Sequence, residues 1–576
     1  MRNSKKYIMM FLVLIVALGL KFSNLWRSTE QVDTFRGAKL ETKVWNPLIA
    51  ESVNEKEISV LVDNRELKSS DTGIFMDENL TLMLPVSVLR DSFNCSAHLY
   101  GKEQLLIEKR NDEILFSLDE PIVTVNKEKN EIASSMVYVD GAYYVPADTV
   151  SKLLKFSYRW DIRENRAVAL SNAEGGSNLP AKYDLRERGR TPSVKNQGRF
   201  GTCWAFAALS AMESEMMPEE VLELSPDHMS LRNSFYLEQT EGGNYTMGMA
   251  YLTAWQGPVY EADDPYGDNV SPDGLKPVKH VQEIQIIGHK DYEEIKEAVF
   301  KYGGVQTSIY SALRSTTKNS EYYNAQTSSY CYIGTKKSNH DVLIIGWDDN
   351  YSRDNFKIEV EGDGAFICQN SWGTGFGDGG VFYVSYYDVN IGSHNLVYTG
   401  IEDTDNYDNI YQTDLCGWVG QLGYNKESIY GANVYTAGSN EELRAAGFYA
   451  VGKDTEYRLY VVKNFENTNS LNESRILVAQ GKLGNSGYYT IPFNKHVTVA
   501  AGERYAVILY VSTPGSDKPL AIEYRADEFT KTVDITDGEG YISLMGNRWE
   551  SLEETQSSNL CLKIYSDNMQ SMEDVQ

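Results

Sequence analysis

A multidomain α+β protein, with three folded regions in series, is expected from this sequence. Its 576 residues exceed the roughly 250–300 that a single hydrophobic core serves, so two to four domains are expected. Residues 58–170 contain an internal repeat, the middle of the chain mixes helical patterns with glycine-bounded apolar runs, and short β-rich runs follow residue 401. We therefore expect a small α+β tandem repeat, a mixed helix-and-sheet domain and a C-terminal β-sandwich.

The composition is that of a globular protein, and its charge excludes one class of partner. Hydrophobic residues make up 42% of the chain and aromatic residues 12%, which is ample for packed cores. The chain has 54 Lys and Arg against 81 Asp and Glu, a formal net charge of −27. Such a charge repels phosphate backbones, so neither nucleic acid nor anionic lipid is an expected partner.

The N-terminus has the layout of a secretory signal. Three basic residues among the first six precede an uncharged apolar run over residues 7–20. We expect export through this signal, and therefore an extracellular or cell-surface protein. The run is shorter than the ~20 residues that comfortably span a bilayer. Cleavage within residues 1–26 is thus expected, and retention as an N-terminal membrane anchor is the alternative.

Six cysteines are too few for a disulfide scaffold in a chain of this length. Neither a C-x-x-C motif nor a cluster of Cys and His is present, so no metal site and no cofactor are expected. The cysteines are Cys95, Cys203, Cys331, Cys368, Cys416 and Cys561.

The internal repeat predicts two small α+β units over residues 50–172, each a strand, a short helix and two strands. A shift of 61 residues pairs Pro85 with Pro146 and Phe93 with Leu154. The pattern resembles the tandem repeat named after the N-terminal domain of copper amine oxidases, an accessory module of exported bacterial proteins. The resemblance carries no copper chemistry here, because the repeat contains one histidine, His98, and a lone histidine is rarely a metal ligand.

A Gly-, Ser- and Asn-rich linker over residues 173–180 separates this repeat from a domain over residues 181–400. The short β-rich runs over residues 401–568 predict a β-sandwich. Residues 505–511 are apolar on both faces, which indicates a central strand, whereas the alternation over residues 457–461 indicates an edge strand. The tyrosines of this region could stack on sugars, but core and cross-strand packing is the more economical interpretation.

Within residues 181–400, a helix is predicted from Cys203 to Met217, before Pro218. Cys203 would then lie at the helix N-terminus, where partial positive charge favours a thiolate over a thiol. A cysteine alone would be read as a packing residue. The surrounding motif makes it a candidate nucleophile.

That motif resembles the nucleophile region of papain-family cysteine peptidases. The matching residues are Gln197, Gly198, Gly201, Cys203, Trp204, Ala205 and Phe206. One departure is Phe200, which stands where the family usually has a disulfide cysteine, so that disulfide is absent. The resemblance implies that the Gln197 amide and the Cys203 backbone N–H form an oxyanion hole.

The other expected catalytic residues follow in the family's order. His340 lies 137 residues after Cys203, at the polar start of an apolar strand, and is the candidate general base. Asn370 follows in Asn370-Ser371-Trp372-Gly373, as the residue that orients the histidine. It arrives somewhat late, because an acidic insertion lengthens the hairpin between the two strands. Trp372 is expected to cover the His340–Asn370 hydrogen bond from water.

The resemblance spans residues 179 to about 388 and implies a two-lobed papain-like fold, with a helical lobe and a β lobe. It also implies that Gly242 and Gly243 line the substrate cleft, where missing side chains let a peptide backbone approach. Asn339 and Trp372 are expected to contribute to the substrate-binding walls. The three-part order of the chain resembles exported bacterial peptidases whose last part is called a lectin-like domain, which implies a carbohydrate or cell-surface ligand there.

We therefore expect an exported cysteine endopeptidase that cleaves protein or peptide substrates through a Cys-His-Asn triad and an acyl-thioester intermediate. A transglutaminase is one rival, but its His lies closer to the Cys and an Asp takes the third position. An adhesin that keeps the peptidase domain as a scaffold is another, and the intact triad argues against it. Residues 58–170 show no long amphipathic helix of the kind found in inhibitory propeptides, so an ordinary zymogen is not expected.

Overall fold

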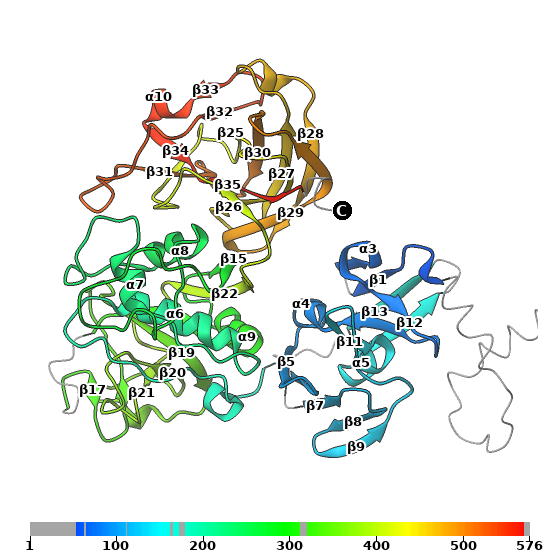
Figure 1. Cartoon of the computed structure of the whole chain (residues 1–576). Coiled ribbons are helices and arrows are strands. Elements are labelled where there is room, and N and C mark those ends of the chain that lie inside the picture. Colours follow the sequence, from blue (N-terminus) through cyan, green and yellow to red (C-terminus); the bar gives the residue numbers. More distant parts are fainter. Residues whose placement is uncertain are drawn as a thin grey trace, which may run out of the picture.

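The computed structural model describes residues 53–62, 65–110, 112–161, 165–171, 179–311 and 319–569 (Figure 1). The predicted signal and most of the predicted linker lie outside these residues. Over the part of the chain that is described, no helix is both long and apolar enough to cross a membrane. The described residues form an N-terminal repeat module, a papain-like region and a sheet-rich C-terminal region, as expected for a multidomain α+β chain.

The two halves of the N-terminal module have the same order of elements, as the internal repeat predicts. The first half has β4 (Leu82–Pro85), α4 (Leu89–Phe93), β5 (Ser96–Tyr100) and β6 (Gln104–Lys109). The second has β11 (Ala142–Pro146), α5 (Ala147–Leu153), β12 (Phe156–Asp161) and β13 (Arg166–Ser171). The halves interlock, because β4 pairs antiparallel with β11 and β13 pairs with β1 (Ser59–Val62). The remaining elements are β2 (Arg65–Lys68), α3 (Ser69–Thr72), β3 (Phe75–Met76), β7 (Asp112–Ser117), β8 (Ile122–Val125), β9 (Glu128–Glu131) and β10 (Val137–Val139).

The papain-like region has helices α6 to α9 and a mixed sheet. The helices are α6 (Cys203–Met216), α7 (Pro226–Leu231), α8 (Tyr245–Thr253) and α9 (Tyr292–Tyr302). The strands are β14 (Lys182–Asp184), β15 (His280–Ile287), β16 (Val305–Ile309), β17 (Tyr323–Asn324), β18 (Ser329–Tyr330), β19 (His340–Asp348), β20 (Ala365–Gln369), β21 (Val381–Ser385) and β22 (Asn395–Glu402). Every residue of the 14-residue helix α6 except Glu215 is buried. This helix is therefore a core element shared by both lobes.

The C-terminal region packs two layers of strands around an apolar core. One layer has the strand order β28-β27-β30-β25-β32-β33. The strand β30 is central, as expected, but β27 lies between β28 and β30, so the prediction of an edge strand there is wrong. The elements are β23 (Asn409–Tyr411), β24 (Gly420–Leu422), β25 (Ser428–Thr436), β26 (Glu441–Ala450), β27 (Thr455–Val462), β28 (Ile476–Leu483), β29 (Ser486–Val499), β30 (Arg504–Ser512), β31 (Leu520–Tyr524), β32 (Gly540–Ser543), β33 (Glu550–Ser551), α10 (Leu552–Gln556), β34 (Ser558–Leu560) and β35 (Leu562–Asn568).

A single sheet runs through both the papain-like and the C-terminal regions. The strand β15 pairs with β22 on one side and with β29 on the other, which joins the two sheets into one of 13 strands. The pairing closes the edge that β15 would otherwise expose. The two regions therefore share backbone hydrogen bonds as well as side-chain contacts.

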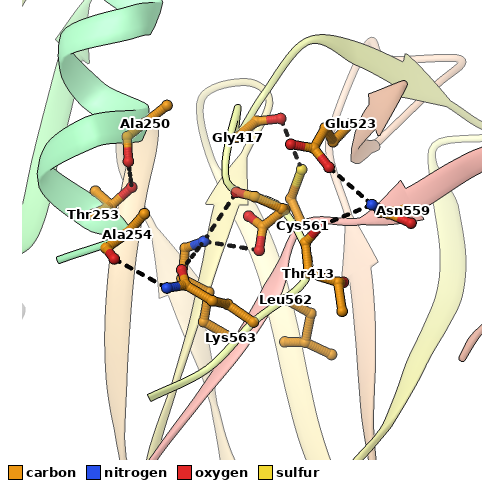
Figure 2. Close-up of polar contacts among 12 residues, drawn as sticks. Ala250, Thr253, Ala254, Thr413, Gly417, Glu523, Asn559, Cys561, Leu562 and Lys563 are labelled. Atoms are coloured by element: carbon orange, nitrogen blue, oxygen red, sulfur yellow. Dashed lines mark hydrogen bonds and ion pairs between the residues drawn. The ribbon is translucent and has the colours of Figure 1, made fainter. Parts of the chain in front are cut away.

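A buried polar cluster reinforces this junction near the C-terminal end of α8 (Figure 2). The Lys563 ammonium lies 2.8 Å from Asp414 Oδ1, and the two side chains are 1% and 0% exposed. Lys563 also donates to Gln412 Oε1, and the Gln412 amide donates to the Ala254 carbonyl. Burial raises the pKa of Asp414, and Lys563 opposes that shift. A charge pair without water is costly to break on one side, so the cluster fixes β35 against the end of α8.

The N-terminal module packs against the end of α6 that is remote from Cys203. Arg90 Nη1 lies 2.7 Å from Glu215 Oε1, and His98 Nε2 lies 3.0 Å from the Lys301 carbonyl at the end of α9. The Tyr183 hydroxyl donates to Glu108 across the same interface at 3.1 Å. The only histidine of the repeat is therefore an interface residue.

Candidate active site

Cys203 is the first residue of α6, as predicted, and it is buried beneath the start of β19. Its thiol receives hydrogen bonds from the backbone N–H groups of Cys203, Trp204 and Asp341, which lower its pKa. Burial is the larger effect and raises the pKa of the thiol to about 12. Burial thus opposes the thiolate that the helix N-terminus is predicted to favour.

His340 is the first residue of β19, and it is bonded to Asn370, which directly follows β20. His340 Nε2 lies 2.8 Å from Asn370 Oδ1. The Ser371 backbone N–H donates to the same oxygen at 2.8 Å, and a backbone amide can only donate, so this atom is the amide oxygen. His340 Nε2 must then carry the proton. The neutral ring keeps its lone pair on Nδ1, the atom that can accept a proton from a thiol.

Trp372 stacks on His340, with ring centroids 4.7 Å apart and an interplanar angle of 27°. The half-buried indole therefore covers one face of the imidazole. Burial lowers the pKa of His340 to about 4, and the bond to Asn370 opposes that shift. Burial thus disfavours the charged form of Cys203 and of His340 when each is taken alone. A thiolate and an imidazolium formed together would compensate each other's charge.

Gln197 is connected to Asn370 through hydrogen bonds with Ser371. The Ser371 hydroxyl donates to Gln197 Oε1 at 2.6 Å, and the Gln197 backbone N–H donates to the Ser371 carbonyl at 2.9 Å. Gln197 Nε2 donates to the Phe200 carbonyl at 2.8 Å, which leaves its second N–H free of that bond. These contacts fix the Gln197 carboxamide on the loop before α6. The sequence motif includes Ser371, but its role as a link between Asn370 and Gln197 was not predicted.

Gly242 and Gly243 lie beside the nucleophile loop. A Cβ on Gly243 would lie 2.2 Å from Nε1 of the buried Trp204, so only glycine fits. A Cβ on Gly201 would lie 2.8 Å from the Gly242 Cα, so these two backbones are also in close contact. Packing against Trp204 thus requires glycine at position 243, whereas Gly242 has room for a Cβ but a φ of +90° that favours glycine.

Asn339 is placed differently from the triad. Its exposed side chain accepts from the Ser311 backbone N–H at 2.6 Å, and its own backbone donates to the Ile309 carbonyl. Through these hydrogen bonds Asn339 holds the segment that follows β16 in place. It lies next to His340 in sequence but makes no described hydrogen bond with the other predicted site residues.

Asp341 is a buried residue of this region that the sequence did not single out. It follows His340 on β19, is 8% exposed, and is held by Ser308 and Gln306 of β16. The sequence feature that could have pointed to Asp341 is a carboxylate directly after the candidate base and before an apolar run. Only the register of β16 against β19, with Ser308 opposite Asp341, reveals its partners.

Comparison with known proteins finds a match for each of the three regions of the chain. Residues 179–401 match the papain family cysteine protease model, residues 61–169 the copper amine oxidase N-terminal domain and residues 410–566 the lectin like domain. Cysteine proteinase 2 of Entamoeba histolytica is 26% identical over 301 residues, covering 50% of this chain and 87% of that protein. Mouse pro-cathepsin H is 26% identical over 239 residues, covering 40% of this chain and 68% of that protein.

Two solved structures of the clostridial cysteine protease Cwp84 share the arrangement of the last two regions. One, solved after propeptide cleavage, has a TM-score of 0.60 at 26% identity and covers 67% of this chain and 99% of that one. The other, of the cysteine protease and lectin-like domains from Clostridium difficile, has a TM-score of 0.59 at 25% identity and covers 68% of this chain and 89% of that one. Residues 179–401 thus match the papain family of cysteine proteases in sequence and in fold, which supports a peptide-bond hydrolase domain followed by a lectin-like domain.

Proposed function

We propose that this protein is an exported cysteine endopeptidase whose catalytic residues are Cys203, His340 and Asn370, with Gln197 in the oxyanion hole. The observation that carries the proposal is the bond from His340 Nε2 to Asn370 Oδ1, because it leaves Nδ1 as the only basic atom of the ring. In the proposed mechanism Nδ1 takes the Cys203 proton as the thiolate sulfur adds to the scissile carbonyl carbon.

The charge that develops on the carbonyl oxygen is stabilised by the Cys203 backbone N–H and the second N–H of Gln197. The imidazolium gives its proton to the leaving amine, the C–N bond breaks, and an acyl thioester remains on Cys203. Water then adds to the thioester with Nδ1 as base, and the thiol is regenerated with release of the acid. Asn370 keeps the ring oriented through both steps, and Trp372 excludes water from that bond.

The cleft is assigned to Gly242, Gly243, Asn339 and Trp372, which would bind a peptide in extended form. We also propose the domain boundaries of the sequence analysis: a repeat module over residues 50–172, a linker over 173–180, a catalytic domain over 181–400 and a lectin-like domain over 401–568. The surface-layer association named for Cwp84 supports a cell-surface location, with a protein or peptide substrate and a carbohydrate or cell-surface ligand.

The test is cleavage of a mixed peptide library by the full chain and by Cys203→Ala, with and without an epoxysuccinyl thiol inhibitor. If the protein hydrolyses peptide bonds, the full chain should form products with new carboxyl ends. Neither Cys203→Ala nor the inhibited protein should form these products. Cross-linked glutamine–amine products would support the transglutaminase instead. Absence of both products from folded protein would support an adhesin with a catalytically idle domain.

A further inference from the structure

The buried carboxylate of Asp341 is linked through Gln306 to Trp204, the residue after the proposed nucleophile, and the proposed mechanism does not use it. Asp341 follows His340 on β19, and its backbone N–H bonds to the Cys203 thiol. Its carboxylate accepts from the Ser308 hydroxyl at 2.7 Å and from the Gln306 amide at 3.0 Å. Both oxygens thus have a fixed donor, which is the arrangement that holds a carboxylate in place.

The same network reaches the backbone of the residue after the nucleophile. Gln306 Nε2 lies 3.4 Å from the Trp204 carbonyl as well as bonding Asp341, and Gln306 Oε1 accepts from the Tyr398 hydroxyl at 3.1 Å. The four groups come from α6, β16, β19 and β22, all of them buried. The carboxylate therefore has a position set by four elements of the core, not by a mobile surface loop.

No described cation is paired with Asp341. The groups that face it are neutral in their usual states: Cys203 from α6, Tyr398 from β22, Tyr245 from α8 and His340 on its own strand. Lys195 lines the same small cavity, but its ammonium is held by Glu213 at 2.5 Å. A negative charge on Asp341 therefore raises the pKa of the Cys203 thiol and of the Tyr245 and Tyr398 hydroxyls, and the thiol has the lowest ordinary pKa of the three.

We propose that Asp341 is a positioning residue that restrains ionisation of Cys203, so that the reactive thiolate is formed less readily when Asp341 carries its charge. This rests on Cys203 being the nucleophile. Charge on Asp341 acts on both members of the Cys203–His340 pair, since it opposes the thiolate and favours the imidazolium. Gln306 links the carboxylate to the Trp204 backbone beside Cys203, whereas His340 is bonded to Asn370, so we take opposition to the thiolate as the main effect, in line with the raised pKa of Cys203.

Because a charged Asp341 opposes the thiolate, the direction in which pH changes the ionisation of Cys203 can be worked out. Burial raises the pKa of Asp341, and its bonds to Ser308 and Gln306 oppose that shift. Below the folded pKa of Asp341 the group is neutral and does not oppose the thiolate. Above that pKa it is charged and does. Replacing Asp341 by Asn removes the charge at all pH values and keeps both contacts, because the Asn oxygen can accept from Gln306 while its NH₂ donates to the Ser308 hydroxyl.

The test is the pH dependence of Cys203 alkylation by iodoacetamide in the full chain, measured from pH 4 to pH 9 and located by mass spectrometry of the digested protein. In Asp341→Asn the alkylation midpoint should move to lower pH, and the rate below the midpoint should rise about threefold or more, equivalent to about half a pKa unit. Asp348→Asn is the matched control. It removes a carboxylate from the far end of the same strand, about 23 Å away at ~3.3 Å per residue, and should leave the midpoint unchanged.

Ser308→Ala provides a second variant if Asp341→Asn does not fold. It removes one bond that favours the charged carboxylate, so Asp341 should stay neutral to higher pH and alkylation should be faster over that interval. An unchanged midpoint in a folded Asp341→Asn protein, or equal shifts in Asp341→Asn and Asp348→Asn, would overturn the inference. Failure of Cys203 to be alkylated in the unmodified chain would instead count against the proposed nucleophile, so the two failures are distinguishable.

Discussion

At Asn370 one amide oxygen accepts two hydrogen bonds, from His340 Nε2 and from the Ser371 backbone. The second bond fixes the amide, and the amide in turn fixes the tautomer of the histidine. This is an orienting task, which differs from the proton transfer proposed for His340. The two residues should therefore differ in how much activity is lost on replacement.

His340→Ala should lower kcat/KM by roughly 10²–10⁴-fold, the range of general acid–base catalysis. Asn370→Ala should lose less, on the order of 10–100-fold, because a misoriented base still accepts protons. Steady-state kinetics on a small peptide substrate measures both. Circular dichroism of each variant controls for folding. A larger loss in Asn370→Ala would mean that the roles are misassigned.

Gly243 offers a test of packing at the residue scale. In Gly243→Ala the new methyl would lie within 2.2 Å of the buried Trp204 ring, so the loop or the ring must move. Overpacking of this kind should lower the free energy of unfolding by about 1–3 kcal/mol. Denaturant unfolding measures it. Gly375→Ala is the control, because Gly375 has nothing within 4 Å of its Cβ position and should be neutral.

At the scale of elements, the candidate catalytic motifs could be placed from sequence because each one coincides with an element boundary. The helix was predicted from Cys203 to Met217 and runs from Cys203 to Met216, and His340 begins its strand as expected. Local signals, such as helix formers before a proline and a polar start to an apolar run, were sufficient there. The acidic insertion also forms the expected connection between β19 and β20.

What could not be predicted depends on pairing between distant segments. The strand β15 pairs with β29 across about 200 residues of sequence, and nothing in either segment specifies that partner. Similarly, the pairing of Ser308 with Asp341 depends on the β16–β19 register. The raised pKa of Cys203 could not be predicted either, since its burial depends on the whole core rather than on its helix.

The β15–β29 pairing can be tested at Gly487. This residue has φ +145°, and a Cβ there would lie 2.0 Å from the Ile284 carbonyl oxygen of β15. Gly487→Ala should therefore weaken the pairing, lower the free energy of unfolding by about 1–3 kcal/mol, and make the chain more sensitive to cleavage between the two regions. Limited proteolysis and thermal unfolding measure this. Gly484→Ala, where the added methyl meets nothing within 4 Å, is the matched control, and equal effects of the two variants would contradict this account.

At the scale of the whole molecule, the two flanking regions are attached in different ways. The lectin-like domain shares a sheet with the catalytic domain, and its buried Lys563–Asp414 cluster reaches the end of α8 through the bond from Gln412 to the Ala254 carbonyl (Figure 2). The repeat module instead contacts the end of α6 near Glu215, about 18 Å along the helix from Cys203 at ~1.5 Å per residue. The module thus contacts α6 at the end opposite Cys203, away from the proposed nucleophile.

Removal of the module should therefore change turnover little. We expect kcat/KM of residues 179–576 to lie within about threefold of that of residues 27–576, with a lower melting temperature because the Glu215 end of α6 loses its partner. Equal active-site concentrations, set by titration with a thiol inhibitor, make the comparison valid. A rise of tenfold or more on removal, about 1.4 kcal/mol of relieved inhibition, would show that the module blocks the cleft.

The central claim is that one sulfur atom, that of Cys203, carries the acyl group. Reaction of the full chain with an epoxysuccinyl peptide inhibitor, followed by mass spectrometry, tests it directly, because the adduct marks the attacking atom and the other five cysteines provide internal controls. One equivalent of inhibitor should be found on Cys203, and peptidase activity should fall in proportion to that labelling. Complete inactivation without modification of Cys203, or full activity in protein labelled there, would contradict the account.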